Sequence, residues 1–274
     1  MRTTPLQLDL DAILRARMPK YSRFIPRWLT AWLERIVCQP QLNILLREAF
    51  PLEGSAFSAS ILRQLDIEVE VEGLDALRGS RRLIFASNHP LGGLDGVTMV
   101  GLLGEAFGDE NIAVMVNDML MNVEPLAGVF LPINKYGGQA RKSVRLIHDA
   151  FVSDKNICVY PAGLVSRLGD DGLIRDLQWQ KSVVAKAIEY GRDVVPVRFE
   201  ALNSARFYRM ARLRKRLGIR INLEQIMLPG EVFSQRGKKF RVVFGAPVSA
   251  TDLRSSGKSP KELAGRLREK VYSL

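Results

Sequence analysis

The chain of 274 residues has an ordinary globular balance, with 47% hydrophobic and 25% charged residues, so a packed core is expected and disorder is not. Two cysteines and two histidines without paired spacing exclude a disulfide framework and the usual zinc motifs, and we expect Cys38 and Cys158 to be buried and inert. The net charge of +11 attracts polyanions, which leaves nucleic acid, anionic lipid and an acidic carrier protein open as partners.

The first twenty residues, "MRTTPLQLDLDAILRARMPK", lack an apolar core followed by a small-residue cleavage site, so no signal peptide is predicted. No stretch approaches the roughly 18 apolar residues that a transmembrane helix requires. We therefore expect a cytoplasmic protein that does not span a membrane but can lie on one.

Residues 1–66 are predicted to form a helical appendage to a domain that covers residues 67–274. Within the appendage, "YSRFIPRWLTAWLERIV" (21–37) spaces its apolar side chains along one helix face. Trp28 and Trp32 on this face, among arginines, suit a membrane interface, because an indole is apolar yet donates a hydrogen bond. A helix that packs on the protein's own core has the same pattern, so both interpretations remain open and one helix can serve both.

From Ile67 onward the pattern alternates between strands and helices. Several of the strands are continuously apolar, as in a sheet that is covered on both faces. We therefore predict an α/β fold, a largely parallel mixed sheet flanked by helices. The strands are expected at 67–73, 82–88, 112–116, 128–133, 156–162, 193–200 and 240–245, and the helices between them at 95–107, 138–153 and 179–191. A last helix is expected with Ser259 as its N-cap and Pro260 at its first position, where Glu262 completes a capping box.

The motif "SNHPLGGLDG" (87–96) contains the first candidate for chemistry. His89 directly follows the apolar strand 82–88, so it is expected near the carboxyl end of a strand, where α/β sheets bind their ligands. Asp95 stands where an N-cap would open the helix 96–107. A capping aspartate and a histidine satisfied by backbone groups would explain these residues without any catalysis.

The loop between the two residues favours a catalytic pair. Pro90 changes the chain direction, and Gly92 and Gly93 allow backbone angles that other residues resist, so Asp95 can fold back onto the imidazole. The carboxylate would then fix the tautomer of His89 and leave its other nitrogen as a general base near neutral pH.

The remaining motifs are weaker. No Gly-x-Ser-x-Gly elbow is present, and "SSGKS" (255–259) lacks the first glycine of a phosphate-binding loop. His148, on an amphipathic helix, is expected to be structural or exposed. The basic stretch "RFYRMARLRKRLGIR" (206–220) holds seven Lys or Arg in fifteen residues. It is either a solvated helix face or, through Arg209, Arg212 and Arg216, a contact for an acidic carrier protein or anionic lipid headgroups. No nucleic-acid-binding module is visible, so nucleic acid is the weakest of the partners.

Four blocks of the sequence, in order, resemble those of the glycerolipid acyltransferase superfamily, the enzymes related to 1-acylglycerol-3-phosphate acyltransferases. "NHPLGGLDG" is similar to the His-x4-Asp block, "GVFLPINK" (128–135) to the acceptor-binding block, "VYPAGLVSR" (159–167) to the Phe-Pro-Glu-Gly-Thr-Arg block, and "VVPVRF" (194–199) to a last apolar block. The resemblance covers roughly residues 67–250.

The departures from the family pattern concern the acceptor. Five residues separate His89 from Asp95 where the family has four, Ala162 replaces a glutamate, the arginine is displaced to Arg167, and Lys135 stands in place of an arginine. Lys135 lacks the planar donor fork of an arginine, and Ala162 lacks a carboxylate. Both differences count against glycerol phosphate as the acceptor. The pattern looks like the hemolysin-like branch, which includes bacterial O-acyltransferases that complete glycine or ornithine lipids. In those enzymes the acceptor is the hydroxyl of a 3-hydroxyacyl chain amide-linked to the amino acid.

The resemblance implies a peripheral enzyme on the inner face of the cytoplasmic membrane that moves a fatty acyl group from acyl carrier protein or coenzyme A to a lyso-lipid hydroxyl. It implies His89 as general base, Asp95 as its orienting partner, and Lys135, Gly163 and Arg167 as acceptor-binding residues, with backbone N–H groups near Gly163 or at the start of helix 96–107 for the oxyanion. No cofactor or metal is expected. A 1-acylglycerol-3-phosphate acyltransferase, and an esterase or thioesterase with the same His–Asp pair, remain the alternatives.

Overall fold

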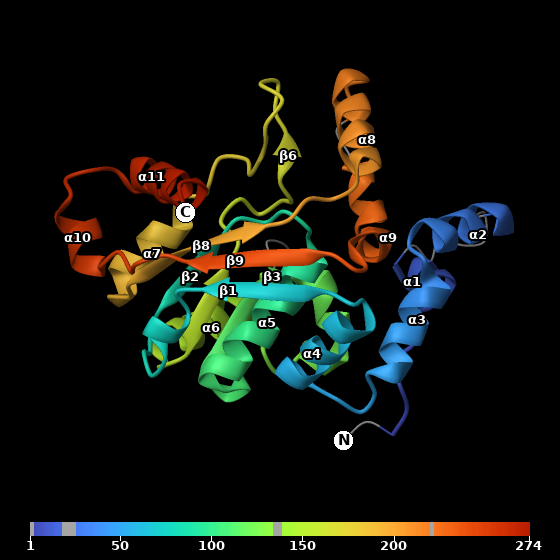
Figure 1. The fold of residues 1–274 in the computed structure, drawn as a ribbon, viewed down its shortest axis with the longest axis horizontal. Helices are drawn as coiled ribbons and strands as arrows, with labels where there is room; N and C mark the ends of the chain where they lie inside the picture. Colours follow the sequence, from blue (N-terminus) through green and yellow to red (C-terminus); the bar gives the residue numbers. More distant parts are fainter. Residues whose placement is uncertain (1–2, 18–25, 134–138, 220–221) are drawn as a thin grey trace.

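The computed structural model describes residues 3–17, 26–133, 139–219 and 222–274. In this part of the chain seven strands form one sheet in the order β1-β9-β8-β2-β5-β3-β4 (Figure 1). The strands are β1 (Glu68–Glu72), β2 (Ile84–Ser87), β3 (Ile112–Asn117), β4 (Phe130–Ile133), β5 (Asn156–Val159), β8 (Val194–Glu200) and β9 (Lys239–Phe244). Each of the seven predicted strands is therefore confirmed, with shifts of a few residues at the ends.

The sheet is mixed but mainly parallel. The five strands β8, β2, β5, β3 and β4 run parallel to one another, and β9 reverses direction next to β8 and pairs in parallel with β1. The central strands β2 and β5 are buried along their whole length, because helices cover both of their faces. The predicted fold class is confirmed.

Two layers of helices enclose the sheet, and alternate residues of β2 contact one layer or the other. Phe85 packs with side chains of α4 (Gly54–Gln64) and α5 (Gly93–Phe107). Ile84 and Ala86 face the second layer. That layer consists of α6 (Gln139–Val152), α7 (Ser182–Tyr190), α10 (Ala250–Ser255) and α11 (Pro260–Tyr272). The predicted capping box opens α11.

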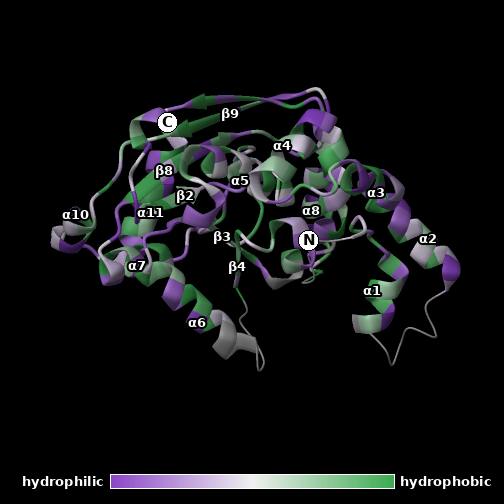
Figure 2. Cartoon of the chain, turned by 90° about the horizontal axis from the view of Figure 1, so that it is seen from below, coloured by the Kyte–Doolittle hydropathy of each residue, from purple (hydrophilic) through white to green (hydrophobic). Residues whose placement is uncertain are grey.

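The N-terminal region is helical, as predicted. Beside α4 it contains α1 (Leu10–Arg17), α2 (Arg27–Ile36) and α3 (Gln39–Glu48), which lie together at one end of the molecule (Figures 1 and 2). Of the helix predicted at 21–37, residues 21–25 lie outside the described residues, and α2 begins after Pro26. Helix α4 of this region packs into the same core as the sheet. The proposed boundary at residue 66 stays a prediction.

Two further elements leave the sheet from its carboxyl edge. A short antiparallel hairpin, β6 (Arg167–Leu168) with β7 (Ile174–Arg175), follows β5, and α8 (Ala205–Arg216) follows β8, with α9 (Leu228–Glu231) further along. The hairpin and α8 project beyond the sheet on the same side (Figure 1). Among the described residues, no helix combines the length and the apolar character that crossing a bilayer requires.

Candidate active site

The site lies at the carboxyl ends of the central parallel strands. His89 comes two residues after β2 ends, and Tyr160 directly follows β5. Asn88 ties this edge to β8, because its side-chain amide donates to the carbonyl of Phe199 at 2.9 Å and its oxygen accepts from the Phe199 N–H at 2.7 Å. Two neighbouring strand ends are thereby held together directly beside His89.

The side chains of His89 and Asp95 face each other, as the sequence predicted. Nδ1 of His89 lies 2.8 Å from Oδ2 of Asp95, whose side chain is fully buried, while the imidazole keeps an exposed fraction of 18%. The backbone N–H of Leu91 donates to both carboxylate oxygens, at 3.0 and 3.2 Å. Burial raises the pKa of Asp95 above its ordinary value, while His89 and the Leu91 N–H act in the opposite direction. When the carboxylate accepts the proton of Nδ1, Nε2 is the ring nitrogen that remains without a proton.

The loop reaches this geometry in a way that differs from the prediction at two points. Helix α5 begins at Gly93 with Gly92 as its N-cap, so Asp95 is the third residue of the helix and not its cap. The side chain of Asp95 instead points back along the helix to His89 and Leu91. Of the two glycines only Gly92, with φ of 87°, needs the conformation that favours glycine.

The two glycines provide a matched pair for a stability test. At Gly92 the positive φ is combined with little space, since an added Cβ would lie 3.2 Å from Cδ1 of Leu228 and 3.3 Å from Cγ2 of Val165. We expect Gly92→Ala to lower the free energy of unfolding by about 1–3 kcal/mol. At Gly93 a Cβ would meet no atom within 4 Å, so Gly93→Ala is expected to be neutral or slightly stabilising. Denaturant unfolding of both variants checks this, and equal losses would contradict it.

Tyr160 supports the imidazole from its flat side. The two ring centroids are 4.3 Å apart with an angle of 29° between the planes, which is a stacked arrangement. Burial raises the pKa of the Tyr160 phenol well above its ordinary value, so the ring stays uncharged beside His89. The sequence analysis placed Tyr160 in the third block but gave it no role.

Asp176 holds the main chain of His89, and the sequence analysis missed it. Its Oδ1 accepts from the His89 N–H at 3.1 Å and from the Ser166 hydroxyl at 2.6 Å, while Oδ2 accepts from Nε1 of Trp179 at 2.9 Å. The Ser166 N–H in turn donates to the carbonyl of His89 at 2.8 Å. His89 is thus fixed through its ring by Asp95 and through its backbone by the segment that follows β5.

The predicted acceptor-binding residues are less accessible than expected. Gly163 is exposed with φ of 67°, but its N–H already donates to the carbonyl of Tyr160 at 3.0 Å. Arg167 donates to the fully buried Glu224 at 2.9 Å, and Arg214 lies 2.8 Å from the other oxygen of that carboxylate. An acceptor anion would have to share Arg167 with Glu224. Lys135 lies outside the described residues.

The residues predicted to contact a membrane or a carrier protein are exposed. Trp28 and Trp32 on α2 are 70% and 53% exposed, whereas Leu29 and Leu33, each the next residue along the chain, are half-buried, so α2 both packs on the protein and presents its indoles outward. On α8 the side chains of Arg209, Arg212 and Arg216 are exposed, next to a stripe of exposed apolar residues made of Met210, Leu213 and Leu217.

The other singled-out residues are not part of the site. His148 is exposed on α6, with Nδ1 2.9 Å from the hydroxyl of Tyr190. Cys158 is fully buried as predicted, and burial raises the pKa of its thiol to about 12. The prediction for Cys38 was wrong in part, since it is only half-buried at the start of α3. Among the described residues, no three His, Cys, Asp or Glu side chains converge as metal ligands would.

Comparison with known proteins identifies one family and several similar proteins. Residues 12–274 match the model of a family described as acyltransferase. A lyso-glycine lipid O-acyltransferase of Bacteroides thetaiotaomicron is 40% identical over 267 residues, which are 97% of each chain. One of Phocaeicola vulgatus is 38% identical over 97% of this chain and 95% of its own. The crystal structure of a 1-acyl-sn-glycerophosphate acyltransferase of Thermotoga maritima aligns with a TM-score of 0.46 and 16% identity, over 96% of this chain and 97% of that one.

Proposed function

This chain belongs to the acyltransferase family, and on that premise we propose that it transfers a fatty acyl group from an acyl thioester to the hydroxyl of an amino-acid-containing lyso-lipid. Membership confirms the resemblance inferred from the sequence, and the two relatives at about 40% identity support lipid O-acyl transfer as the activity. Their names make a glycine lipid the first candidate for the acceptor. Glycerol phosphate lipids are the second candidate.

The observation that carries the mechanism is the His89–Asp95 pair at 2.8 Å. Nε2 of His89 removes the proton from the acceptor hydroxyl as its oxygen attacks the thioester carbonyl. The C–S bond then breaks, and the departing thiolate takes the proton back from the imidazolium. Asp95 orients the ring throughout and stabilises its positive form. Neither a covalent enzyme intermediate nor a metal takes part in these steps.

The developing oxyanion needs hydrogen-bond donors. The first N–H groups of α5 have no partner within the helix, and they lie within six residues of His89 in the chain. The Gly163 N–H is engaged with Tyr160, so the start of α5 is the better of the two predicted donor sites.

Product analysis tests this function against its alternatives. The purified enzyme is incubated with an acyl thioester of acyl carrier protein or of coenzyme A, with and without N-(3-hydroxyacyl)glycine. We expect an O-acylated glycine lipid only when the acceptor is present. Release of free fatty acid at the same rate with or without acceptor would identify an esterase or thioesterase, and acylation of 1-acylglycerol 3-phosphate alone would identify the phospholipid enzyme.

We place the enzyme on an anionic membrane surface, with α8 and α2 in contact with the lipid. The support is the exposed apolar stripe of α8 beside three arginines and the two exposed indoles of α2. Each arginine near such a surface contributes about 1 kcal/mol to binding. The inner face of the cytoplasmic membrane is the surface that the expected cytoplasmic location offers.

Replacement of Arg209, Arg212 and Arg216 together by glutamine is expected to weaken binding to vesicles that contain phosphatidylserine about 100-fold, because three such contributions are lost. Co-sedimentation with vesicles of increasing anionic content measures the affinity. As a control, a second triple variant removes the same charge from exposed positions of α11, namely Lys261, Arg266 and Lys270. Equal losses in the two variants, or binding that is independent of anionic lipid, would contradict the proposal.

A further inference from the structure

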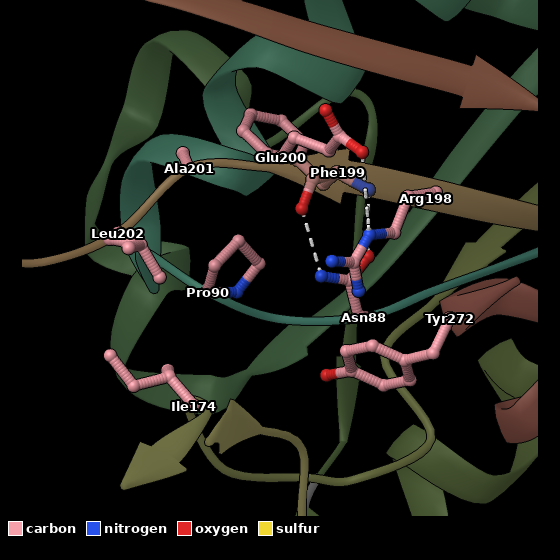
Figure 3. Close-up of a pocket in the computed structure, with 9 residues that line it drawn as sticks. All are labelled: Asn88, Pro90, Ile174, Arg198, Phe199, Glu200, Ala201, Leu202 and Tyr272. Atoms are coloured by element: carbon pink, nitrogen blue, oxygen red, sulfur yellow. Dashed lines mark hydrogen bonds and ion pairs between the residues drawn. The ribbon is translucent and has the colours of Figure 1, made fainter. Parts of the chain in front are cut away.

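A pocket of about 350 Å³ opens at the carboxyl edge of the sheet, against the main chain on either side of His89. It is lined by Asn88 and Pro90, the two chain neighbours of His89, and by residues of β8 and of the segment that follows it. Pro90, Leu202 and Ile174 form an apolar side, while Arg198 and Tyr272 lie on the opposite side (Figure 3). A ligand in this pocket would therefore have both an apolar and a charged surface to contact, next to the loop that contains His89.

Arg198 is the only cation among the nine lining residues, and its charge is poorly matched by the protein. In the described part of the chain its closest anion is Glu200, 3.9 Å from Nε, which is a long ion pair. Its Nη1 is buried and has no hydrogen-bond partner among the described residues. The guanidinium is held in place by the ring of Tyr272, whose centroid is 4.4 Å away.

Glu200 also lines the pocket, but it is turned partly toward another cation. Its Oε1 lies 3.4 Å from Nη1 of Arg241, which is closer than its distance from Arg198. The charge of Glu200 is thus shared with Arg241, and both of these side chains are partly exposed to solvent. By contrast, the arginine predicted to bind the acceptor, Arg167, is paired with the buried Glu224.

We infer that this pocket binds the carboxylate of the acceptor's amino acid, with Arg198 as its counter-ion; the inference rests on the function proposed above. In an N-(3-hydroxyacyl)glycine, one amide unit with a methylene group on each side separates the carboxylate from the carbon that carries the hydroxyl, a span of about 6 Å. A carboxylate in the pocket therefore leaves the hydroxyl within reach of the loop that contains His89. Arginine suits this task, because its planar fork of donors matches a carboxylate.

The test compares two acceptors that differ only in charge, N-(3-hydroxyacyl)glycine and the corresponding glycinamide. We expect the wild-type enzyme to prefer the acid by about 10- to 100-fold in kcat/KM, the range of a charge-assisted hydrogen bond. Arg198→Met is expected to lose this preference by slowing transfer to the acid while transfer to the amide stays within about twofold. Arg198→Lys, which keeps the charge but not the fork, is expected to fall in between.

The ratio of the two rates is measured in the same protein sample, so partial unfolding of a variant does not change it. Arg175→Met is the matched control, because Arg175 is exposed, lies 5.9 Å from the same Tyr272 ring and does not line the pocket. It is expected to keep the wild-type preference. Equal slowing of both acceptors by Arg198→Met would overturn the inference and leave the proposed function standing. If the wild-type enzyme acylated neither acceptor, the proposed function itself would fail.

Discussion

Replacement of His89 by alanine is expected to lower kcat/KM for acyl transfer by about 10²–10⁴, the contribution of a positioned general base. Among the described residues no other histidine is paired with a carboxylate, so the acceptor hydroxyl would lose its base. Initial rates of transfer from an acyl thioester to the lyso-lipid, at saturating donor, measure the loss.

The second histidine of the chain is the control for this variant. His148 is exposed on α6 and bonded to Tyr190, so His148→Ala is expected to retain wild-type rates. Thermal unfolding of His89→Ala shows whether the variant keeps its fold despite the lost stacking on Tyr160. A folded His89→Ala enzyme with more than about half of the wild-type rate would refute the assigned role.

Asp95→Asn is expected to cost about 10²–10⁴ in kcat with a much smaller change in KM, because the carboxylate stabilises the imidazolium that forms during transfer. The two oxygens of the carboxylate accept from Nδ1–H of His89 and from the Leu91 N–H. An asparagine amide has only one oxygen, so it cannot replace both acceptors. Steady-state kinetics at several pH values separate kcat from KM. A rise in KM at constant kcat would mean that Asp95 only shapes the loop.

The same variant gives a stability test with a defined sign. Burial raises the pKa of Asp95 above 3.8, so the folded protein holds the proton of this carboxyl more tightly than the unfolded chain does. The ionisation of Asp95 therefore lowers the free energy of unfolding of the wild type as the pH rises from 3.8 to the pKa of Asp95 in the folded protein. The asparagine variant has no carboxyl at this position and does not show this loss. Relative to the wild type, Asp95→Asn should gain stability through this window and stay level above it. Denaturant unfolding of both proteins across the acid range measures the difference, and a relative loss with rising pH would contradict the sign.

The sheet was predictable because several of its strands are continuous apolar runs, while β1 alternates apolar and acidic residues, and turn-forming segments separate them. The hairpin of β6 and β7 was not, since strands of two residues have no periodicity to detect. The first residue of α5 was misplaced for a related reason: apolar spacing indicates a helix but does not fix where it starts. The local sequence pattern therefore predicted which helices and strands exist better than it predicted the residues at which they begin and end.

In the site, the His89–Asp95 contact was predictable because both residues lie in one short loop. Asp176 and Arg198 were not, since each is brought to His89 or to its pocket from a segment about a hundred residues away. Only the order of strands in the sheet places those segments side by side. Asp176 lies in no recognised motif, and the block that contains Arg198, "VVPVRF", was identified only by its apolar character.

The hydrogen bonds of Asp176 also connect His89 to the last helix. Its backbone N–H donates to the hydroxyl of Tyr272 at 2.6 Å, and its carbonyl accepts from Nη2 of Arg268 at 2.6 Å, both on α11. A small shift of α11 would thus be transmitted to the backbone of His89 through one residue. For enzyme engineering, substitutions that shift this helix offer a way to tune turnover without replacing any side chain that contacts the lipid.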